Sequence, residues 1–92
     1  MALIADDPQE AINSALSVLE KMMNDRDVPR NVKEVIAKAI EYLKREDRDY
    51  HMRASAAADA LNEITEKQNV PRYLRQRIRQ VIVMLESVPP GS

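Results

Sequence analysis

Asn-Val-Pro-Arg at residues 69–72 decides the fold, together with its earlier copy Asp-Val-Pro-Arg at residues 27–30. Each stretch places a polar residue, a valine, a proline and an arginine before a run with helical periodicity. Proline fixes φ near the helical value and lacks the N–H that a helix start leaves unpaired. Pro29 and Pro71 therefore predict the first turns of two helices.

The segments that flank these turns repeat as well. At the 42-residue shift that relates the two prolines, five apolar positions are identical, namely Ala15/Ala57, Leu19/Leu61, Ile36/Ile78, Ile40/Ile82 and Leu43/Leu85. Matches separated by three, four or seven positions are typical of two copies of one helix–turn–helix unit. A period of about 40 also occurs in arrays of helical pairs, but such arrays need at least about three units. A closed bundle is therefore favoured over a two-unit array.

The apolar periodicity predicts four helices, at about residues 8–24, 29–45, 49–67 and 71–87. Asp7 before Pro8, with Glu10 three positions after the cap, is a typical helix start. Helices joined by connections of about 2–6 residues favour an antiparallel four-helix bundle, here built from a duplicated helix–turn–helix pair. We expect one all-α domain over residues 1–92. Residues 1–6 are expected to form a leader, whose Leu3 and Ile4 could fold back on the bundle.

Alanine gives the third predicted helix a small inner face, at Ala54, Ala57 and Ala58. Small side chains let a neighbouring backbone approach closely, so this helix is expected to lie deepest. Ile36 and Ile40 are expected inward on the second helix. Glu41 and Arg45 have the i,i+4 spacing of an exposed ion pair. The charged run at residues 45–49 is expected to form a solvated corner between helices.

Composition narrows the class of protein. Apolar residues make up 45% of the 92 residues and charged residues 32%, which is ordinary for a helical domain. Phe, Trp and Cys are absent, so the core must be aliphatic and no disulfide or thiolate chemistry is available. No apolar run approaches the roughly 20 residues of a membrane span. A net charge of −1 disfavours general binding to nucleic acid or membrane surfaces. The expected location is the cytoplasm.

Residues able to perform chemistry are scarce. His51 is the single histidine, and the Glu-x-x-His spacing of bundle metal sites is absent. Glu63 and Glu66 occupy outward positions, and Gly91 alone cannot form a phosphate-binding glycine loop. We therefore expect neither an enzyme nor a cofactor or metal site.

Two surface features stand above this background. Arg30 and Arg72 lie at helix starts, where a cation opposes the helix dipole by roughly 0.3–1 kcal/mol. Either a nearby carboxylate offsets each of them, such as Asp27 or Glu34 for Arg30, or they face an anion or partner. The last helix also carries an outward face that is rich in Arg, Tyr and Met, as protein interfaces are. This candidate interaction surface comprises Arg72, Tyr73, Gln76, Arg77, Arg79, Gln80, Val83 and Met84.

The doubled turn, with three further stretches, resembles a family of short archaeal proteins that is uncharacterised. The matching stretches are residues 24–33, Arg-Ala-Ser at 53–55, Leu-Asn-Glu-Ile at 61–64 and Asn-Val-Pro at 69–71. The resemblance implies a four-helix bundle of bromodomain-like shape in an archaeal, cytoplasmic protein. It implies no activity, and a shared bundle shape does not imply acetyl-lysine binding.

Two functional hypotheses follow. The first is a protein-interaction or assembly module, which uses the last helix to bind an unknown protein partner or a second copy of the chain. The alternative is weak RNA- or ribosome-associated binding through Arg72, Arg75, Arg77 and Arg79. The absence of aromatic stacking platforms and the pI of about 5.8 weigh against RNA.

Overall fold

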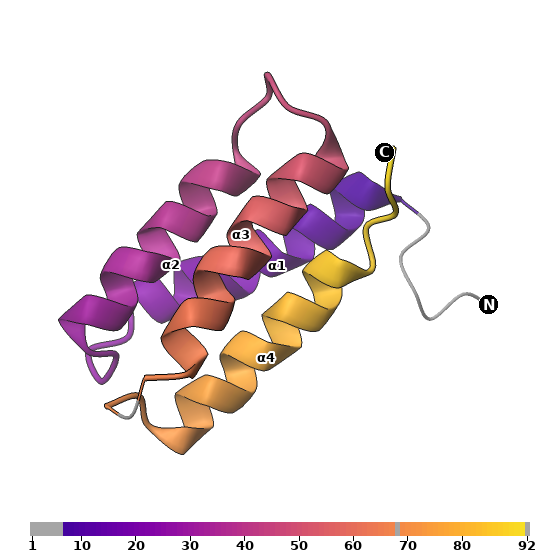
Figure 1. Cartoon of the computed structure of the whole chain (residues 1–92). Coiled ribbons are helices and arrows are strands. Elements are labelled where there is room, and N and C mark those ends of the chain that lie inside the picture. The colour runs from indigo at the N-terminus through magenta and orange to yellow at the C-terminus, as the bar shows by residue number, and fades with distance from the viewer. Residues whose placement is uncertain (1–6, 68, 92) are drawn as a thin grey trace.

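The computed structural model describes residues 7–67 and 69–91. They form four α-helices and no strand, which confirms the predicted all-α bundle (Figure 1). The helices are α1 (Pro8–Met23), α2 (Arg30–Leu43), α3 (Tyr50–Thr65) and α4 (Arg72–Glu86). Each ends within about two residues of its predicted end. The leader predicted over residues 1–6 lies outside the described residues.

Successive helices reverse direction, and α3 lies between α2 and α4 with α1 packed behind them (Figure 1). The most extensive contacts join α3 to α2 and α3 to α4, and α3 also touches α1. Helices α2 and α4 do not contact each other within the described residues. The third helix is thus the most deeply packed, as its alanines predict.

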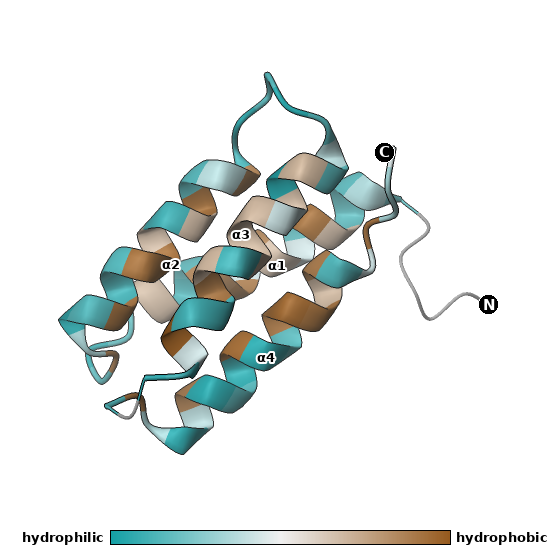
Figure 2. Ribbon diagram, viewed as in Figure 1, coloured by the Kyte–Doolittle hydropathy of each residue, from teal (hydrophilic) through white to brown (hydrophobic). Residues whose placement is uncertain are grey.

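The core is aliphatic, and in Figure 2 apolar residues form stripes along the helices. Leu19, Leu61 and Ile82, which the repeat places inward, are all buried. Ile40 was expected on the inner stripe of α2, yet it is only partly buried and packs at the edge of the core. The sequence patterns missed buried residues in the connections and the C-terminal segment, namely Val28, Val70 and Val88.

Three connections of six residues, at 24–29, 44–49 and 66–71, join the helices, and the first two make matching backbone hydrogen bonds. In the first, the Asp25 amide donates to the Met22 carbonyl at 3.2 Å and the Val28 amide to Asp25 at 3.3 Å. The second repeats this pattern, because the Arg45 amide donates to Tyr42 and the Arg48 amide to Arg45, both at 3.3 Å. The path is therefore set mainly by backbone hydrogen bonds.

Helices α2 and α4 begin one residue later than predicted. Pro29 has φ −59° and ψ 153°, and Pro71 has φ −57° and ψ 148°. The proline ring sets φ only, and the extended ψ makes each proline the N-cap, so the helices begin at Arg30 and Arg72. In the second connection the same place is taken by Asp49, whose carboxylate accepts from the Met52 amide at 2.8 Å.

Arg53, in the second turn of α3, caps the C-terminal end of α2. Its Nε and Nη2 donate to the Leu43 carbonyl at 3.0 and 2.7 Å. The guanidinium lies over the Tyr50 ring, with its carbon 5.1 Å from the ring centroid. A cation is favourable at a helix C-terminus, where the last carbonyls lack backbone partners. Arg53 thus ties the two ends of the second connection together.

The described residues of the helices and connections include none with a left-handed backbone conformation. Within the described part of the chain, Gly91 alone has a positive φ, at 82°. It follows the last helix and has nothing near the place of an added Cβ.

Replacing Ala57 by leucine should destabilise the bundle by about 1–3 kcal/mol, because the larger side chain overpacks a fully buried site. Urea unfolding followed by circular dichroism measures this loss. Ala60→Leu, at a partly exposed site on the same helix, is the matched control and should change stability by less than about 0.5 kcal/mol. Equal losses in the two variants would contradict the close packing of α3.

Replacing Arg53 by glutamine should lower the free energy of unfolding by about 1.5 kcal/mol, because two charged hydrogen bonds to Leu43 are lost. Arg26→Gln, in an exposed part of the first connection, controls for the change in net charge and should leave stability within about 0.5 kcal/mol. Thermal unfolding of both variants tests this, and an Arg53→Gln variant as stable as the wild type would refute it.

Candidate interaction surfaces

The eight candidate residues of the last helix lie together on α4, and we call them the α4 surface. Seven of them are exposed and Met84 is partly buried. Tyr73 is 46% exposed and Val83 66%, which makes them two of the three large apolar residues exposed in the described chain. In Figure 2 the first half of α4 is mostly hydrophilic, and hydrophobic residues gather in its second half. An apolar and a basic portion thus share one helix face.

The arginines of α4 divide into two groups. Arg72, Arg77 and Arg79 are exposed and form no ion pair with any described residue. Arg75 instead turns toward the third connection, where its Nη2 donates to the Lys67 carbonyl at 2.8 Å. The buried Nε of Arg75 has no hydrogen-bond partner among residues 7–67 and 69–91. The RNA hypothesis counted Arg75 as a phosphate contact, but this side chain is already bound to the protein.

The carboxylate partners suggested for the helix-start arginines are not found. Arg30 and Arg72 are exposed, and neither makes an ion pair within the part of the chain that the structure describes. Asp27 and Glu34 therefore do not offset Arg30. Both arginines leave their guanidinium groups to solvent at the starts of α2 and α4.

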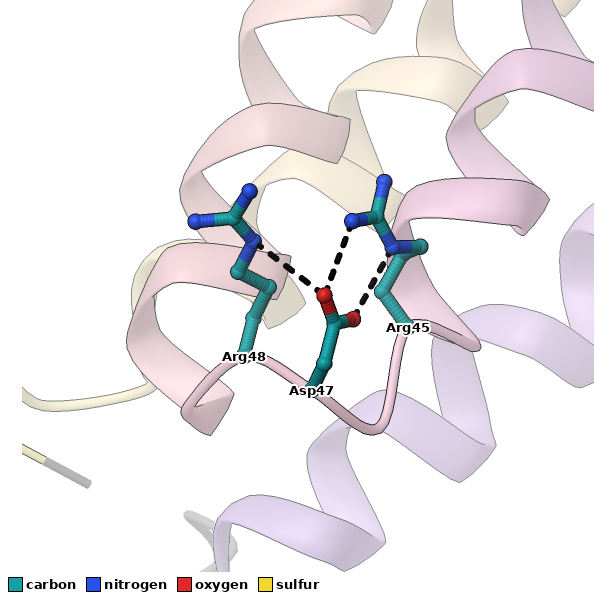
Figure 3. Close-up of polar contacts among 3 residues, drawn as sticks. All are labelled: Arg45, Asp47 and Arg48. Atoms are coloured by element: carbon teal, nitrogen blue, oxygen red, sulfur yellow. Dashed lines mark hydrogen bonds and ion pairs between the residues drawn. The ribbon is translucent and has the colours of Figure 1, made fainter.

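The second connection carries a compact ion-pair cluster (Figure 3). Arg45 donates to Asp47 through Nε at 3.0 Å and Nη2 at 2.9 Å, and Arg48 Nε lies 3.8 Å from the same carboxylate. The expected pair of Arg45 with Glu41 is absent from the described structure, because Asp47 offers both of its oxygens to the Arg45 fork. The corner is exposed, as predicted, and three of its charged side chains are in contact with one another.

The contact between Arg45 and Asp47 shifts the pKa values of both side chains. Hydrogen bonds from the Arg45 side chain are the largest cause that lowers the pKa of Asp47, from the ordinary 3.8 to about 2. The charges of Arg45 and Arg48 add to this effect. The same hydrogen bonds raise the pKa of Arg45. Arg45 and Asp47 therefore stay charged over a wider pH range than they would apart.

His51 and Ser55 lie one turn apart on α3, beside a hollow of about 180 Å³ between α3 and α4. The Ser55 hydroxyl is 3.5 Å from His51 Nε2, and His51 Nδ1 is 3.3 Å from the Val88 carbonyl. Sequence reasoning did not foresee this pair, although the i,i+4 spacing signals it. A hydrolytic site would also need donors aimed at an oxyanion, and the amide of Ser55 lies inside a helix. The pair instead joins the segment after α4 to α3.

Residues that ligate metals are dispersed in the described chain. No three His, Asp or Glu side chains of residues 7–67 and 69–91 gather closely enough to bind a metal ion. Glu63 and Glu66 are both exposed near the end of α3. None of the helices that the structure describes combines the length and hydropathy needed to cross a bilayer.

An NMR titration of the Asp47 carboxyl group should give a midpoint near pH 2, and Arg45→Gln should return it toward 3.8. Because the folded pKa is the lower one, the ionised contact favours the folded state above pH 3.8. This contribution is lost as the pH falls through 3.8 toward about 2. Arg26→Gln is the control that should leave the midpoint unchanged. A wild-type midpoint near 3.8 would show that the fork to Arg45 does not form in solution.

Comparison with known proteins identifies relatives that span the whole bundle. The UPF0147 protein of Aeropyrum pernix is 39% identical over 89% of this chain and 90% of its own length. The UPF0147 protein of Methanopyrus kandleri is also 39% identical, over 89% of this chain and 80% of its own length. Both are archaeal, as the resemblance implied.

Solved structures share the fold. The crystal structure of the unknown-function protein MMP1188 superposes with a TM-score of 0.85 at 28% identity, and covers 90% of this chain and 94% of that protein. A protein of the uncharacterised family UPF0147 from Thermoplasma acidophilum gives 0.82 at 26% identity, over 88% and 95%. The profile of the Uncharacterised protein family (UPF0147) matches residues 1–88. The chain therefore belongs to this family.

Proposed function

We propose that this protein is a non-catalytic interaction module that binds an acidic protein partner through the α4 surface. The observation that carries the proposal is the combination of Arg72, Arg77 and Arg79, which lack ion pairs in the described structure, with the exposed Tyr73 and Val83 on the same face. Arginine and tyrosine are enriched at protein interfaces and at their energetic hot spots. Unpaired arginines beside exposed apolar side chains support a surface that a partner covers.

The charge of α4 supports an acidic partner. The helix holds four arginines against Glu86 alone, which gives it a local charge of +3 while the whole chain carries −1. Opposite charges on a partner would steer the encounter and fix its orientation. In a two-fold dimer centred on this face, the same patch meets itself, so arginines would face arginines. A distinct acidic protein is therefore favoured over a second copy of the chain.

Under this proposal the protein has no enzymatic activity. His51 Nδ1 lies 3.3 Å from the Val88 carbonyl and its Nε2 lies 3.5 Å from the Ser55 hydroxyl, and these contacts join the segment after α4 to α3. An interaction role needs only a rigid frame and a surface, and the aliphatic bundle supplies both. A cytoplasmic location, inferred from the composition, belongs to the same proposal.

A photo-crosslinking amino acid at Gln80 should capture a specific acidic protein in lysate of the source organism, and the same group at Ser17 on α1 should not. Binding of that purified protein should weaken at least about tenfold in Tyr73→Ser/Val83→Ser, because interface hot spots contribute about 2 kcal/mol or more. It should also weaken as salt is added, since salt screens exposed charges.

Two further measurements could contradict the proposal: light scattering, which gives the oligomeric state, and nuclease treatment, which shows whether capture depends on RNA. If the wild type is a dimer that Val83→Glu converts to a monomer, the occupant of α4 is a second copy and the acidic-partner proposal is wrong. If capture at Gln80 depends on intact RNA, the alternative RNA hypothesis replaces it. A purified partner that binds Tyr73→Ser/Val83→Ser as tightly as the wild type would also refute the proposal.

A further inference from the structure

A second hollow lies on the outer side of the α2–α3 corner, away from α4, and we call it the Arg48 pocket. Its volume is about 190 Å³, and it is lined by Tyr42, Arg45, Arg48, Met52, Arg53 and Ala56. Met52, within this lining, is 50% exposed, although it is a large apolar side chain. The lining thus combines the apolar surfaces of Tyr42, Met52 and Ala56 with three arginines.

The pocket lies where the second connection departs from the other two. The fifth residue of the first and third connections is a valine, Val28 and Val70, and both are buried in the core. The fifth residue of the second connection is Arg48, whose side chain is 51% exposed. The first and second connections otherwise make matching backbone hydrogen bonds. One corner of the bundle therefore presents a cation where the others bury an apolar side chain.

The arginines at this corner keep donors for a ligand. Arg48 uses Nε toward Asp47, and its two terminal nitrogens point away from that carboxylate (Figure 3). These two nitrogens bind no group in the described chain. Arg53 is fixed by its bonds to Leu43, and Arg45 by its bonds to Asp47. Guanidinium pairs of N–H donors match the two oxygens of a carboxylate.

The size of the pocket limits what can fill it. Sites for drug-sized ligands and cofactors usually measure about 300–1,000 Å³. A pocket of about 190 Å³ is smaller than that and suits one apolar side chain of a protein. Phosphate-backbone binding would need several free cationic contacts in a row, but Arg45 and Arg53 are already bound to Asp47 and Leu43. Size and charge together favour a peptide segment over a nucleotide or nucleic acid.

We propose that the Arg48 pocket binds a short protein segment that inserts one apolar side chain between Tyr42 and Met52 and offers an adjacent carboxylate to Arg48. The occupant is an acidic segment with a single leucine-sized anchor. The side chain covers the exposed Met52, and the carboxylate takes the terminal nitrogens that Asp47 leaves free. This site is separate from the α4 surface and does not depend on the function proposed for it.

The acetylated peptide Asp-Asp-Leu-Asp-Asp-amide serves as the probe, and ¹H–¹⁵N NMR of the full chain as the measurement. Saturable shifts should centre on the amides of Tyr42, Arg48, Met52 and Ala56. Arg48→Gln should weaken binding about tenfold, because the fork of charged donors is lost. Ala56→Leu, which fills the pocket and keeps every charge, should weaken it similarly. The spectrum itself reports whether each variant is folded.

Matched controls make the proposal refutable. Arg26→Gln and Tyr73→Ser/Val83→Ser should bind the probe as the wild type does, which separates this site from the α4 surface. The peptides Asn-Asn-Leu-Asn-Asn and Asp-Asp-Gly-Asp-Asp should give no saturable shifts. Absence of saturable shifts with the probe itself, equal binding of either control peptide, or the same shifts with oligouridine would each overturn the proposal.

Discussion

Close packing against the alanine face of α3 is the constraint on which the rest of the structure depends. Ala54, Ala57 and Ala58 are buried where α3 meets its neighbours, and this helix touches all three others. Protein interiors are packed as densely as organic crystals, so a site that admits only a methyl group sets the spacing of the helices around it. The aliphatic residues of α1, α2 and α4 then fill the remaining volume. Without aromatic side chains in the core, this interdigitation must supply most of the hydrophobic stabilisation.

The three connections show how segments of equal length can carry different chemistry. Pro29 and Pro71 cap their helices with no side-chain hydrogen bond, whereas Asp49 supplies one through its carboxylate. Val28 and Val70 extend the core beyond the helix ends, and Arg48 does not. Both arginine-bearing surfaces discussed above therefore lie outside the duplicated apolar pattern. The repeat maintains the frame, and the departures from it make the two halves chemically distinct.

The helices could be predicted from the sequence because the apolar period and the Asp7 cap act locally. The predicted starts of α2 and α4, at Pro29 and Pro71, were wrong by one residue. Proline specifies φ, whereas ψ decides where a helix begins. Ile40 was assigned to the core because the apolar periodicity of the sequence does not distinguish the edge of a helix's apolar stripe from its centre.

The candidate surfaces could be predicted less completely. The hydrogen-bond partner of a long side chain depends on which groups lie near it in the folded structure, and sequence spacing does not show this. Arg45 donates to Asp47 and not to Glu41, and Arg75 donates to the Lys67 carbonyl in the preceding connection. The frame itself reserves no left-handed position for glycine between residues 7 and 67 or 69 and 90. At these described positions any L-amino acid can therefore be accommodated without left-handed backbone strain. This tolerance is consistent with the TM-scores of 0.82–0.85 against two solved structures whose sequences are only 26–28% identical to this chain. A common scaffold can therefore display a different chemical face in each lineage.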